Sequence, residues 1–298
     1  MKVLVTGGTG FLGKNLMKHR PDWVYVSSKD CDLTKQEKVE ELFVCHKPDA
    51  ILHLAANVGG IKKNVESQAD FYTNNTLIDV NVLSVANKVG INRVLSSLST
   101  CAFPDQIKTY PFQEESLFDG EPAKTNHSYG MTKRMLQIGS NSYRDQYKRN
   151  YSTFTPSNIY GPHDHFGEES SHFVASLIDK VANSKDGEEL EFWGTGTPLR
   201  QQMYVDDLCK IIPVLLEEHN TEVPIIVAPS ENLSIREMIE SLISKVDKKV
   251  MFRFNGLLDG QYRKDGSNKK LMSIIKDFEF TSFEKGVKST YDWYLENK

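Results

Sequence analysis

The sequence predicts an α/β protein: a Rossmann-type, doubly wound parallel sheet with a smaller C-terminal α/β domain. Two observations lead to this prediction. Short apolar runs alternate with stretches of helical periodicity along the first half of the chain. A glycine-rich turn, residues 7–13, joins the first apolar run to the first helical stretch. Because parallel strands need long crossover connections, which are usually helices, such an alternation is typical of a parallel sheet.

The strands of the sheet are expected where apolar runs are short and end in turn residues. These runs are residues 2–6, 23–27, 50–56, 93–98, 153–156 and 224–228. Helices are expected where apolar residues recur at helical spacing. These stretches are residues 12–19, 39–46, 69–89, 129–147, 172–182 and 233–246, with a further helix starting near residue 204. The intervening residues 57–62 are expected to form a loop.

A change in the character of the sequence marks a domain boundary. The regular alternation ends after Gly161-Pro162, where a polar stretch begins. The last predicted sheet strand then comes much later, at residues 224–228. We therefore predict a Rossmann domain made of residues 1–164 and 204–228, and a smaller substrate domain made of residues 165–203 and 229–298.

Composition and charge are those of an ordinary globular chain. The 298 residues carry a net charge of −4, and no run of Lys and Arg indicates a nucleic-acid partner. The apolar runs fall short of the roughly 20 residues of a membrane span, and the N-terminal run is too short for a signal peptide. The cysteines, Cys31, Cys45, Cys101 and Cys209, have neither disulfide-framework nor metal-ligand spacing. We therefore expect a cytoplasmic protein without a metal site.

The glycine-rich turn is suited to a dinucleotide. Its glycines allow a tight turn and a close approach of a pyrophosphate, and the helix that follows directs its N-terminus at the phosphates. The spacing is G-x-x-G-x-x-G rather than G-x-G-x-x-G, and glycine also serves any tight turn. The position between the first strand and the first helix favours the dinucleotide interpretation. The residues expected at the cofactor are Gly7, Gly10, Phe11, Leu12 and Gly13.

The end of the second predicted strand indicates which dinucleotide binds. Proteins that prefer NAD usually place an acid there for the ribose 2′-hydroxyl. Here the strand runs into Ser28-Lys29, whose hydroxyl and cation suit a 2′-phosphate, so NADP(H) is favoured. Asp30 and Asp32 lie close by and favour the opposite choice, and a solvated turn is the remaining alternative.

Tyr129 and Lys133 are the strongest catalytic candidates. Four residues apart on a helix, they share one face, where an ammonium beside a phenol favours the phenolate. Such a pair can exchange a proton with a carbonyl oxygen near neutral pH. A lone Tyr-x-x-x-Lys is more often an ordinary helix surface, but here it follows a dinucleotide turn.

Further motifs extend along nearly the whole chain. They are His53-Leu54-Ala55-Ala56, Val58-Gly59-Gly60, Leu98-Ser99-Thr100-Cys101, Asn158-x-Tyr160-Gly161-Pro162-His163-Asp164, His172, Trp193-Gly194-x-Gly196-x-Pro198-x-Arg200 and Val205-Asp206-Asp207. With these motifs the chain resembles the extended short-chain dehydrogenase/reductases, in particular those that act on a GDP-4-keto-6-deoxy sugar. The Val-Gly-Gly, Ser-Thr-Cys and Gly-Pro-His-Asp motifs are the narrowest of the set.

The resemblance implies NADPH-dependent 3,5-epimerisation and 4-reduction of GDP-4-keto-6-deoxy-D-mannose to GDP-L-fucose. The implied reductase triad is Ser99, Tyr129 and Lys133, and the implied epimerisation pair is Cys101 and His172. The residues implied to hold the GDP-sugar are Lys180, Trp193, Arg200 and Asp259. The further residues expected to contact NADP(H) are Ser28, Lys29, Asp32, Leu33, Leu54, Ala55, Ala56, Ser97, Leu98, Thr100, Pro156, Ser157, Asn158 and Ile159.

The chemistry of a 4-keto sugar agrees with these roles. Its hydrogens at C3 and C5 are acidic, because loss of either gives an enolate on the C4 oxygen. Ser99 and Tyr129 can hydrogen-bond that oxygen, while a thiol and an imidazole ionise readily enough to move the protons. Each residue also has a plain alternative: Cys101 as a buried apolar side chain and His172 as a residue that caps a helix.

Rival functions remain at this point. One is another nucleotide-sugar epimerase, dehydratase or reductase of the same fold, and a weaker one is a non-catalytic NADP-sensing protein. The dehydratases carry an acidic pair after the catalytic Ser or Thr, whereas Cys101-Ala102 follows Thr100 here. Non-catalytic relatives often lack the Tyr or the Lys, and this chain has both. The helices at 70–89 and 128–147 carry extra apolar residues, and the resemblance implies that two copies pair through them as a homodimer.

Overall fold

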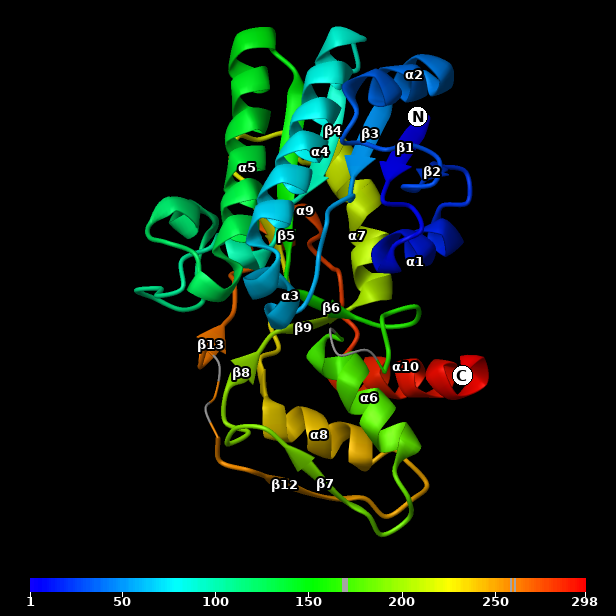
Figure 1. Cartoon of the computed structure of the whole chain (residues 1–298), viewed down its shortest axis with the longest axis vertical. Coiled ribbons are helices and arrows are strands. Elements are labelled where there is room, and N and C mark those ends of the chain that lie inside the picture. Colours follow the sequence, from blue (N-terminus) through cyan, green and yellow to red (C-terminus); the bar gives the residue numbers. More distant parts are fainter. Residues whose placement is uncertain (168–170, 258, 260) are drawn as a thin grey trace.

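The computed structural model describes residues 1–167, 171–257, 259 and 261–298, and the chain forms two lobes (Figure 1). The larger lobe is built on a six-stranded, all-parallel sheet in the order β10-β5-β4-β3-β1-β2. Its strands are β1 Val3–Thr6, β2 Val24–Val26, β3 Ala50–His53, β4 Arg93–Ser97, β5 Asn150–Pro156 and β10 Ile225–Val227. The chain passes from β1 to β2 on one side and returns to β3 on the other. The predicted doubly wound α/β class is confirmed.

Both faces of this sheet are covered, because alternate residues of each strand point to opposite sides. Leu4 packs into one apolar core and its neighbour Val5 into the other. The helices on the Leu4 side are α2 Gln36–His46, α4 Gln68–Lys88 and α5 His127–Tyr147. Those on the Val5 side are α1 Phe11–His19 and α7 Val205–Glu218. Burial on both faces explains why the strands are almost continuously apolar.

The smaller lobe has its own core, in which Leu177, Met238 and Val287 are fully buried. Its helices are α6 Phe173–Asn183, α8 Ile235–Ile243 and α10 Phe283–Asn297. Its strands are β6 Asn158–Tyr160 paired with β9 Gln202–Tyr204, β7 Glu189–Phe192 paired with β12 Met251–Phe254, and β8 Leu199–Arg200 between β11 Leu233–Ser234 and β13 Arg263–Lys264. Helix α8 is fixed at its start by a capping box of Ser234 and Glu237.

The C-terminal stretch also returns to the larger lobe. Helix α9, Lys269–Ile274, packs near β10, and Leu271 is buried in the core of the sheet. The boundaries of the two predicted domains stay a prediction. Within the described part of the chain, no helix is both long and apolar enough to cross a lipid bilayer.

Short helices follow β3 and β4 in the structure. The expected loop at residues 57–62 is wrong at its end, because helix α3, Ile61–Glu66, begins there. The side-chain amide of Asn64 donates hydrogen bonds to the carbonyls of Gly59 and Gly60, which closes the first turn of α3. Beyond β4, the chain enters the short 3-10 helix η1, Thr100–Ala102. Two further 3-10 turns, η2 Glu114–Phe118 and η3 Lys124–Asn126, precede α5.

Candidate active site

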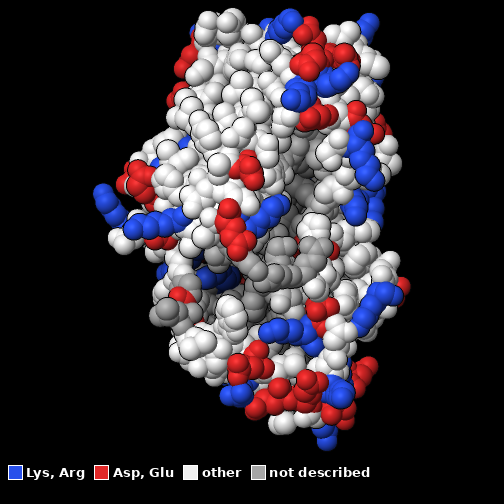
Figure 2. All heavy atoms as spheres, viewed as in Figure 1, with Lys and Arg blue, Asp and Glu red and all other residues white. Residues whose placement is uncertain are grey.

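A cavity of about 1570 Å³ lies at the carboxyl ends of the sheet strands and extends into the smaller lobe. The surface is visibly hollowed between the two lobes (Figure 2). Residues from both lobes line it, including the turn before α1 at one end and Trp193 at the other. Its position is the one at which doubly wound sheets bind ligands.

The turn before α1 is shaped to let a phosphate approach the backbone. Gly7 has φ +72°, and a Cβ there would lie 2.9 Å from the amide nitrogen of Ala55. A Cβ on Gly13 would lie 2.5 Å from the carbonyl oxygen of Gly8, so close packing of α1 on the turn requires glycine. No side chain caps the first turn of α1, and Gly10 lines the cavity. These residues fit the pyrophosphate of a dinucleotide.

The predicted cofactor residues line this cavity with one exception. They are Gly7, Gly10, Phe11, Leu12, Gly13, Ser28, Asp32, Leu33, Leu54, Ala55, Ala56, Ser97, Leu98, Thr100, Pro156, Ser157, Asn158 and Ile159. Lys29 is exposed and is not among the lining residues, so its contact with a 2′-phosphate stays a prediction.

The two acidic residues after β2, Asp30 and Asp32, accept hydrogen bonds from residues of their own turns. The Asp30 carboxylate accepts hydrogen bonds from the backbone and the hydroxyl of Ser27 at 2.8 and 2.6 Å, which lower the pKa of Asp30. The Asp32 carboxylate accepts similarly from Thr34. In this arrangement the Asp30 carboxylate closes the turn. Its presence therefore does not favour NAD, with its ribose 2′-hydroxyl, over NADP, with its 2′-phosphate.

Ser99, which follows β4, and Tyr129 and Lys133 of α5 meet at the cavity. Burial raises the pKa of the Tyr129 phenol above its ordinary value; nearby Cys101 and Asp79 add to the rise, and a hydrogen bond with Ser99 opposes it. The Lys133 ammonium is buried and lies 5.9 Å from the centre of the Tyr129 ring. This direction favours the neutral phenol, which is the form that donates a proton. The bias toward the phenolate that we expect from Lys133 stays a prediction.

Cys101 lies beside this group but is not among the residues that line the cavity. Strand alternation does not relate Cys101 to Ser99, because the 3-10 helix η1 begins between them. Instead the Ser99 hydroxyl caps η1 and accepts a hydrogen bond from the Cys101 amide at 3.2 Å. Gly130 allows α5 to pack on this turn, since a Cβ there would lie 2.5 Å from the Cys101 carbonyl oxygen.

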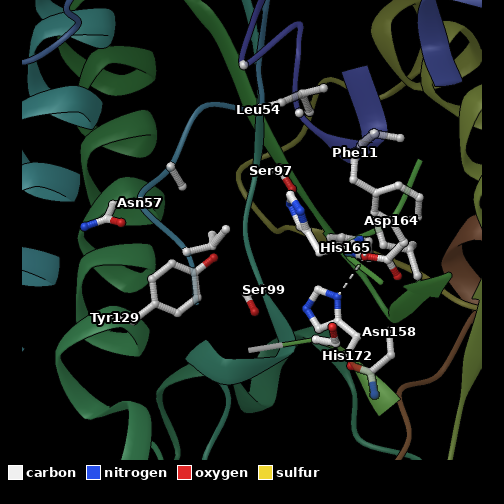
Figure 3. A pocket seen from close by; sticks show the side chains of 18 of the residues that line it. Phe11, Leu54, Asn57, Ser97, Ser99, Tyr129, Asn158, Asp164, His165 and His172 are labelled. Carbon is white, nitrogen blue, oxygen red and sulfur yellow. Dashed lines mark hydrogen bonds and ion pairs between the residues drawn. The ribbon is translucent and has the colours of Figure 1, made fainter. Parts of the chain in front are cut away.

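His172 approaches from the smaller lobe, immediately before α6. Its Nδ1 lies 3.4 Å from Oδ1 of Asp164, a carboxylate that is almost fully buried. The same oxygen accepts a hydrogen bond from the His165 amide at 2.8 Å. The contact with Asp164 raises the pKa of His172. Figure 3 shows the His172 ring joined to Asp164, with Ser99 and Tyr129 facing the same space from other elements.

The far end of the cavity carries the predicted nucleotide-sugar residues, and all four line it: Lys180, Trp193, Arg200 and Asp259. The Trp193 side chain is 81% exposed, which is unusual for an indole and leaves a flat ring open to a ligand. Burial lowers the pKa of Arg200, although a guanidinium keeps its charge at neutral pH. Asp259 accepts hydrogen bonds from the Thr195 amide and hydroxyl at 2.9 and 2.6 Å, which ties it to the turn after Trp193.

Sequence reasoning missed some residues of the site. Asp164 belongs to a motif that we singled out, but no role followed from the sequence. Asn57 lines the cavity and is held by Asn75, whose side chain accepts from the Asn57 amide at 2.8 Å. Lys264 lies next to Cys101, far from it in sequence, and no local motif marks it. In the described residues, no group of three or more His, Cys, Asp or Glu side chains could hold a metal ion.

Comparison with known proteins agrees with this geometry. The sequence profile of the NAD dependent epimerase/dehydratase family matches residues 3–228. A probable GDP-L-fucose synthase of Drosophila melanogaster is 38% identical, over 99% of this chain and 98% of that protein. The GDP-L-fucose synthase of Dictyostelium discoideum is 34% identical, over 99% and 95%. The crystal structure of a GDP-L-fucose synthetase from Naegleria fowleri bound to NADP has a TM-score of 0.92 at 32% identity and covers 99% of this chain and 92% of that one.

Proposed function

The chain belongs to the NAD dependent epimerase/dehydratase family, and from this membership and its site we infer that it is an NADPH-dependent oxidoreductase with epimerase activity. It converts GDP-4-keto-6-deoxy-D-mannose to GDP-L-fucose by 3,5-epimerisation and 4-reduction. The observation that carries this proposal is the single cavity in which Ser99, Tyr129 and His172 lie between a dinucleotide turn and the Trp193 end. The full-length similarity to GDP-L-fucose synthases supports the choice of substrate.

The epimerisation depends on groups that hold an enolate and groups that move protons. We propose that Ser99 and Tyr129 donate hydrogen bonds to the C4 oxygen, which stabilises the charge that develops there. Cys101 takes a proton from C3 or C5, and the electron pair of the broken C–H bond moves onto that oxygen. His172, whose pKa is raised by Asp164, returns a proton from the opposite side.

The reduction uses the same oxygen site. The dinucleotide, when bound, supplies the hydride that reduces C4. Tyr129 then gives its proton to the new alkoxide, which is consistent with a buried phenol that favours its neutral form. Lys133, buried beside Tyr129, places a positive charge that stabilises the phenolate left behind.

The far end of the cavity binds the nucleotide. Trp193 offers a ring on which a purine can stack, and Arg200 and Lys180 offer positive charge to the diphosphate. Lys180 lies 5.1 Å from the Phe192 ring centre, which places its ammonium at this end. Asp259 fixes the turn that carries Trp193 through its bonds to Thr195.

Deuterium uptake from heavy water tests the epimerase assignment apart from reduction. The unmodified protein, with NADP⁺ bound, should exchange the hydrogens at both C3 and C5 of the 4-keto sugar. Cys101→Ser should exchange little, because a hydroxyl of similar size is far less acidic, and with NADPH it should yield an unepimerised 6-deoxy product. His172→Gln should impair exchange as well. Exchange by Cys101→Ser at the unmodified rate would reduce Cys101 to a packing residue.

We propose that two copies associate through α4 and α5. These helices pack against each other, and the face they turn outward carries exposed apolar side chains, among them Leu77, Val80, Met135 and Ile138. Figure 2 shows the broad uncharged surface over α4 and α5. Light scattering should give a dimer that Val80→Glu with Met135→Glu dissociates; a monomeric unmodified protein contradicts the proposal.

We place the protein in the cytoplasm, and we divide it into the two predicted domains. All four cysteines are free, as is usual in a reducing compartment. The separate core of the smaller lobe, which contains Leu177, Met238 and Val287, supports a second domain, and its predicted boundaries stay a proposal.

A further inference from the structure

The thiol of Cys101 has a charged neighbour from a distant part of the chain. The ammonium of Lys264 donates a hydrogen bond to the Cys101 sulfur, with Nζ and Sγ 3.7 Å apart. Both side chains are partly buried. Among the described residues, the sulfur is the hydrogen-bond partner that the structure gives this ammonium, since Lys264 forms no ion pair with a described carboxylate.

The backbone around Lys264 is held on both sides. On one side, β13 pairs with β8 in a register that sets Lys264 opposite Arg200. On the other, Phe112 donates its amide to the Asp265 carbonyl at 2.9 Å and accepts from the Ser267 amide at 2.7 Å. Lys264 therefore projects from a ladder that is anchored to both lobes.

The charged side chains near Lys264 are bonded to other groups, so the Lys264 ammonium is left to contact the Cys101 sulfur. Alternate residues of a strand point to opposite sides, so Arg263 and Asp265 share the side away from Lys264. Arg263 donates to the Asp265 carboxylate at 2.9 Å and lies 5.2 Å from the Tyr110 ring centre. The Arg134 guanidinium, which approaches η1 from α5, donates to the Ala102 carbonyl. The group that Lys264 itself contacts is the sulfur.

A thiol must lose its proton before it can take one from carbon. In the proposed reaction the C–H bond breaks, its electron pair moves to the C4 oxygen, and the proton goes to the sulfur. An ammonium beside the sulfur favours the thiolate that starts this step and holds it in place. We propose that Lys264 is a positioning residue that keeps Cys101 as an oriented thiolate. The consequence for catalysis rests on the proposed epimerase function, whereas the pairing itself does not.

Alkylation by iodoacetamide tests the pairing without substrate, because the thiolate is the species that reacts. Peptide mass spectrometry at neutral pH follows each cysteine separately. Lys264→Met and Lys264→Gln should slow alkylation of Cys101 roughly tenfold, the lower end expected for a hydrogen bond to a charged group. Lys264→Arg should restore most of the rate. Exposed Cys45 should react equally in all variants, and buried Cys209 should stay protected if the fold is intact.

Lys269→Met is the matched control, since it removes one exposed ammonium from the same segment. It should leave the alkylation of Cys101 unchanged. Equal alkylation of Cys101 in unmodified protein and in both neutral variants, with Cys209 protected, overturns the proposal. So does an equal loss in Lys269→Met.

Deuterium exchange at C3 and C5 then tests the catalytic consequence. Both neutral variants should lose exchange about as much as they lose alkylation, while their affinity for NADPH stays the same. If alkylation falls and the unmodified protein exchanges nothing, the pairing is supported and the epimerase function fails. If exchange persists at the full rate while alkylation falls, Lys264 has no role in catalysis and the proposal is overturned.

Discussion

Substitution of Asp164 measures how far a buried carboxylate raises the pKa of the neighbouring His172 imidazole. Asp164→Asn removes the negative charge but keeps an oxygen that can accept from the His165 amide, so the loop should hold its shape. Because Asp164 raises the pKa of His172, the imidazolium is fully present below that pKa and is lost as pH rises through it. Removing the charge should move this loss to lower pH.

The geometry sets the size of the effect. The two atoms are 3.4 Å apart, and the imidazole is 67% exposed although the carboxylate is only 1% exposed. A solvent-screened pair of this kind contributes about 0.2–1 kcal/mol. The buried partner favours the upper end, and 1 kcal/mol corresponds to about a fivefold change in the ratio of imidazolium to imidazole. Exchange at C3 and C5 should fall by up to about that factor above neutral pH.

Two assays check this prediction. A histidine NMR titration should show His172 losing its proton at lower pH in Asp164→Asn. His219 is an internal reference, because burial lowers its pKa to about 4. The pH profiles of deuterium exchange should converge at low pH, where the imidazolium is complete in both proteins, and separate as pH rises. An unchanged or upward-shifted titration of His172 would refute the reasoning.

Three further outcomes are expected. Tyr129→Phe should lower the rate of NADPH oxidation by about 10²–10⁴, the usual contribution of a general acid, with NADPH affinity nearly intact; reduction at the unmodified rate would make Tyr129 structural. Lys29→Ala should lower the ratio of kcat/KM with NADPH to kcat/KM with NADH by about tenfold, because an exposed ammonium makes only a modest contact with the 2′-phosphate. Equal kcat/KM with the two dinucleotides in the unmodified protein would contradict the prediction. Gly130→Ala should lower the free energy of unfolding by about 1–3 kcal/mol in thermal melts, because its Cβ meets the Cys101 carbonyl at 2.5 Å. Gly139→Ala is its control, since there the Cβ meets only the end of Leu83, and equal effects would count against the clash.

The predictable part of the fold is the part with local signals. Apolar runs, the glycine turn and the helical spacing around Tyr129 predict the sheet, its cofactor edge and α5, since these patterns follow directly from strand and helix geometry. The sequence could not show that Ser99 caps η1, because a 3-10 turn of three residues has no periodicity. The Tyr129–Lys133 spacing is local and therefore predictable, whereas the raised pKa of Tyr129 comes from burial, which depends on what covers α5.

Long-range contacts explain what the sequence left out of the site. Lys264 reaches Cys101 only because β13 pairs with β8 across the smaller lobe. Asp164 and His172 are near in sequence. The carboxylate is nevertheless buried by tertiary packing, which a local sequence pattern does not show. The cavity lining near the glycine turn was predictable because family motifs carry those residues. The hydrogen bond of Asp30 to Ser27 was not, because it depends on the turn that Asp30 closes.

The late position of β10 and α9 in the chain bears on biosynthesis. A ribosome delivers β1 through β5, with the glycine turn and Tyr129, before it has made any of α7, β10 or β13. During that interval β5 is an open sheet edge, and the apolar face that α7 and α9 later cover is exposed. The nascent chain thus contains most of the dinucleotide-binding residues before the nucleotide-sugar end of the cavity exists. NADPH that binds at this stage would stabilise the five-stranded part of the sheet.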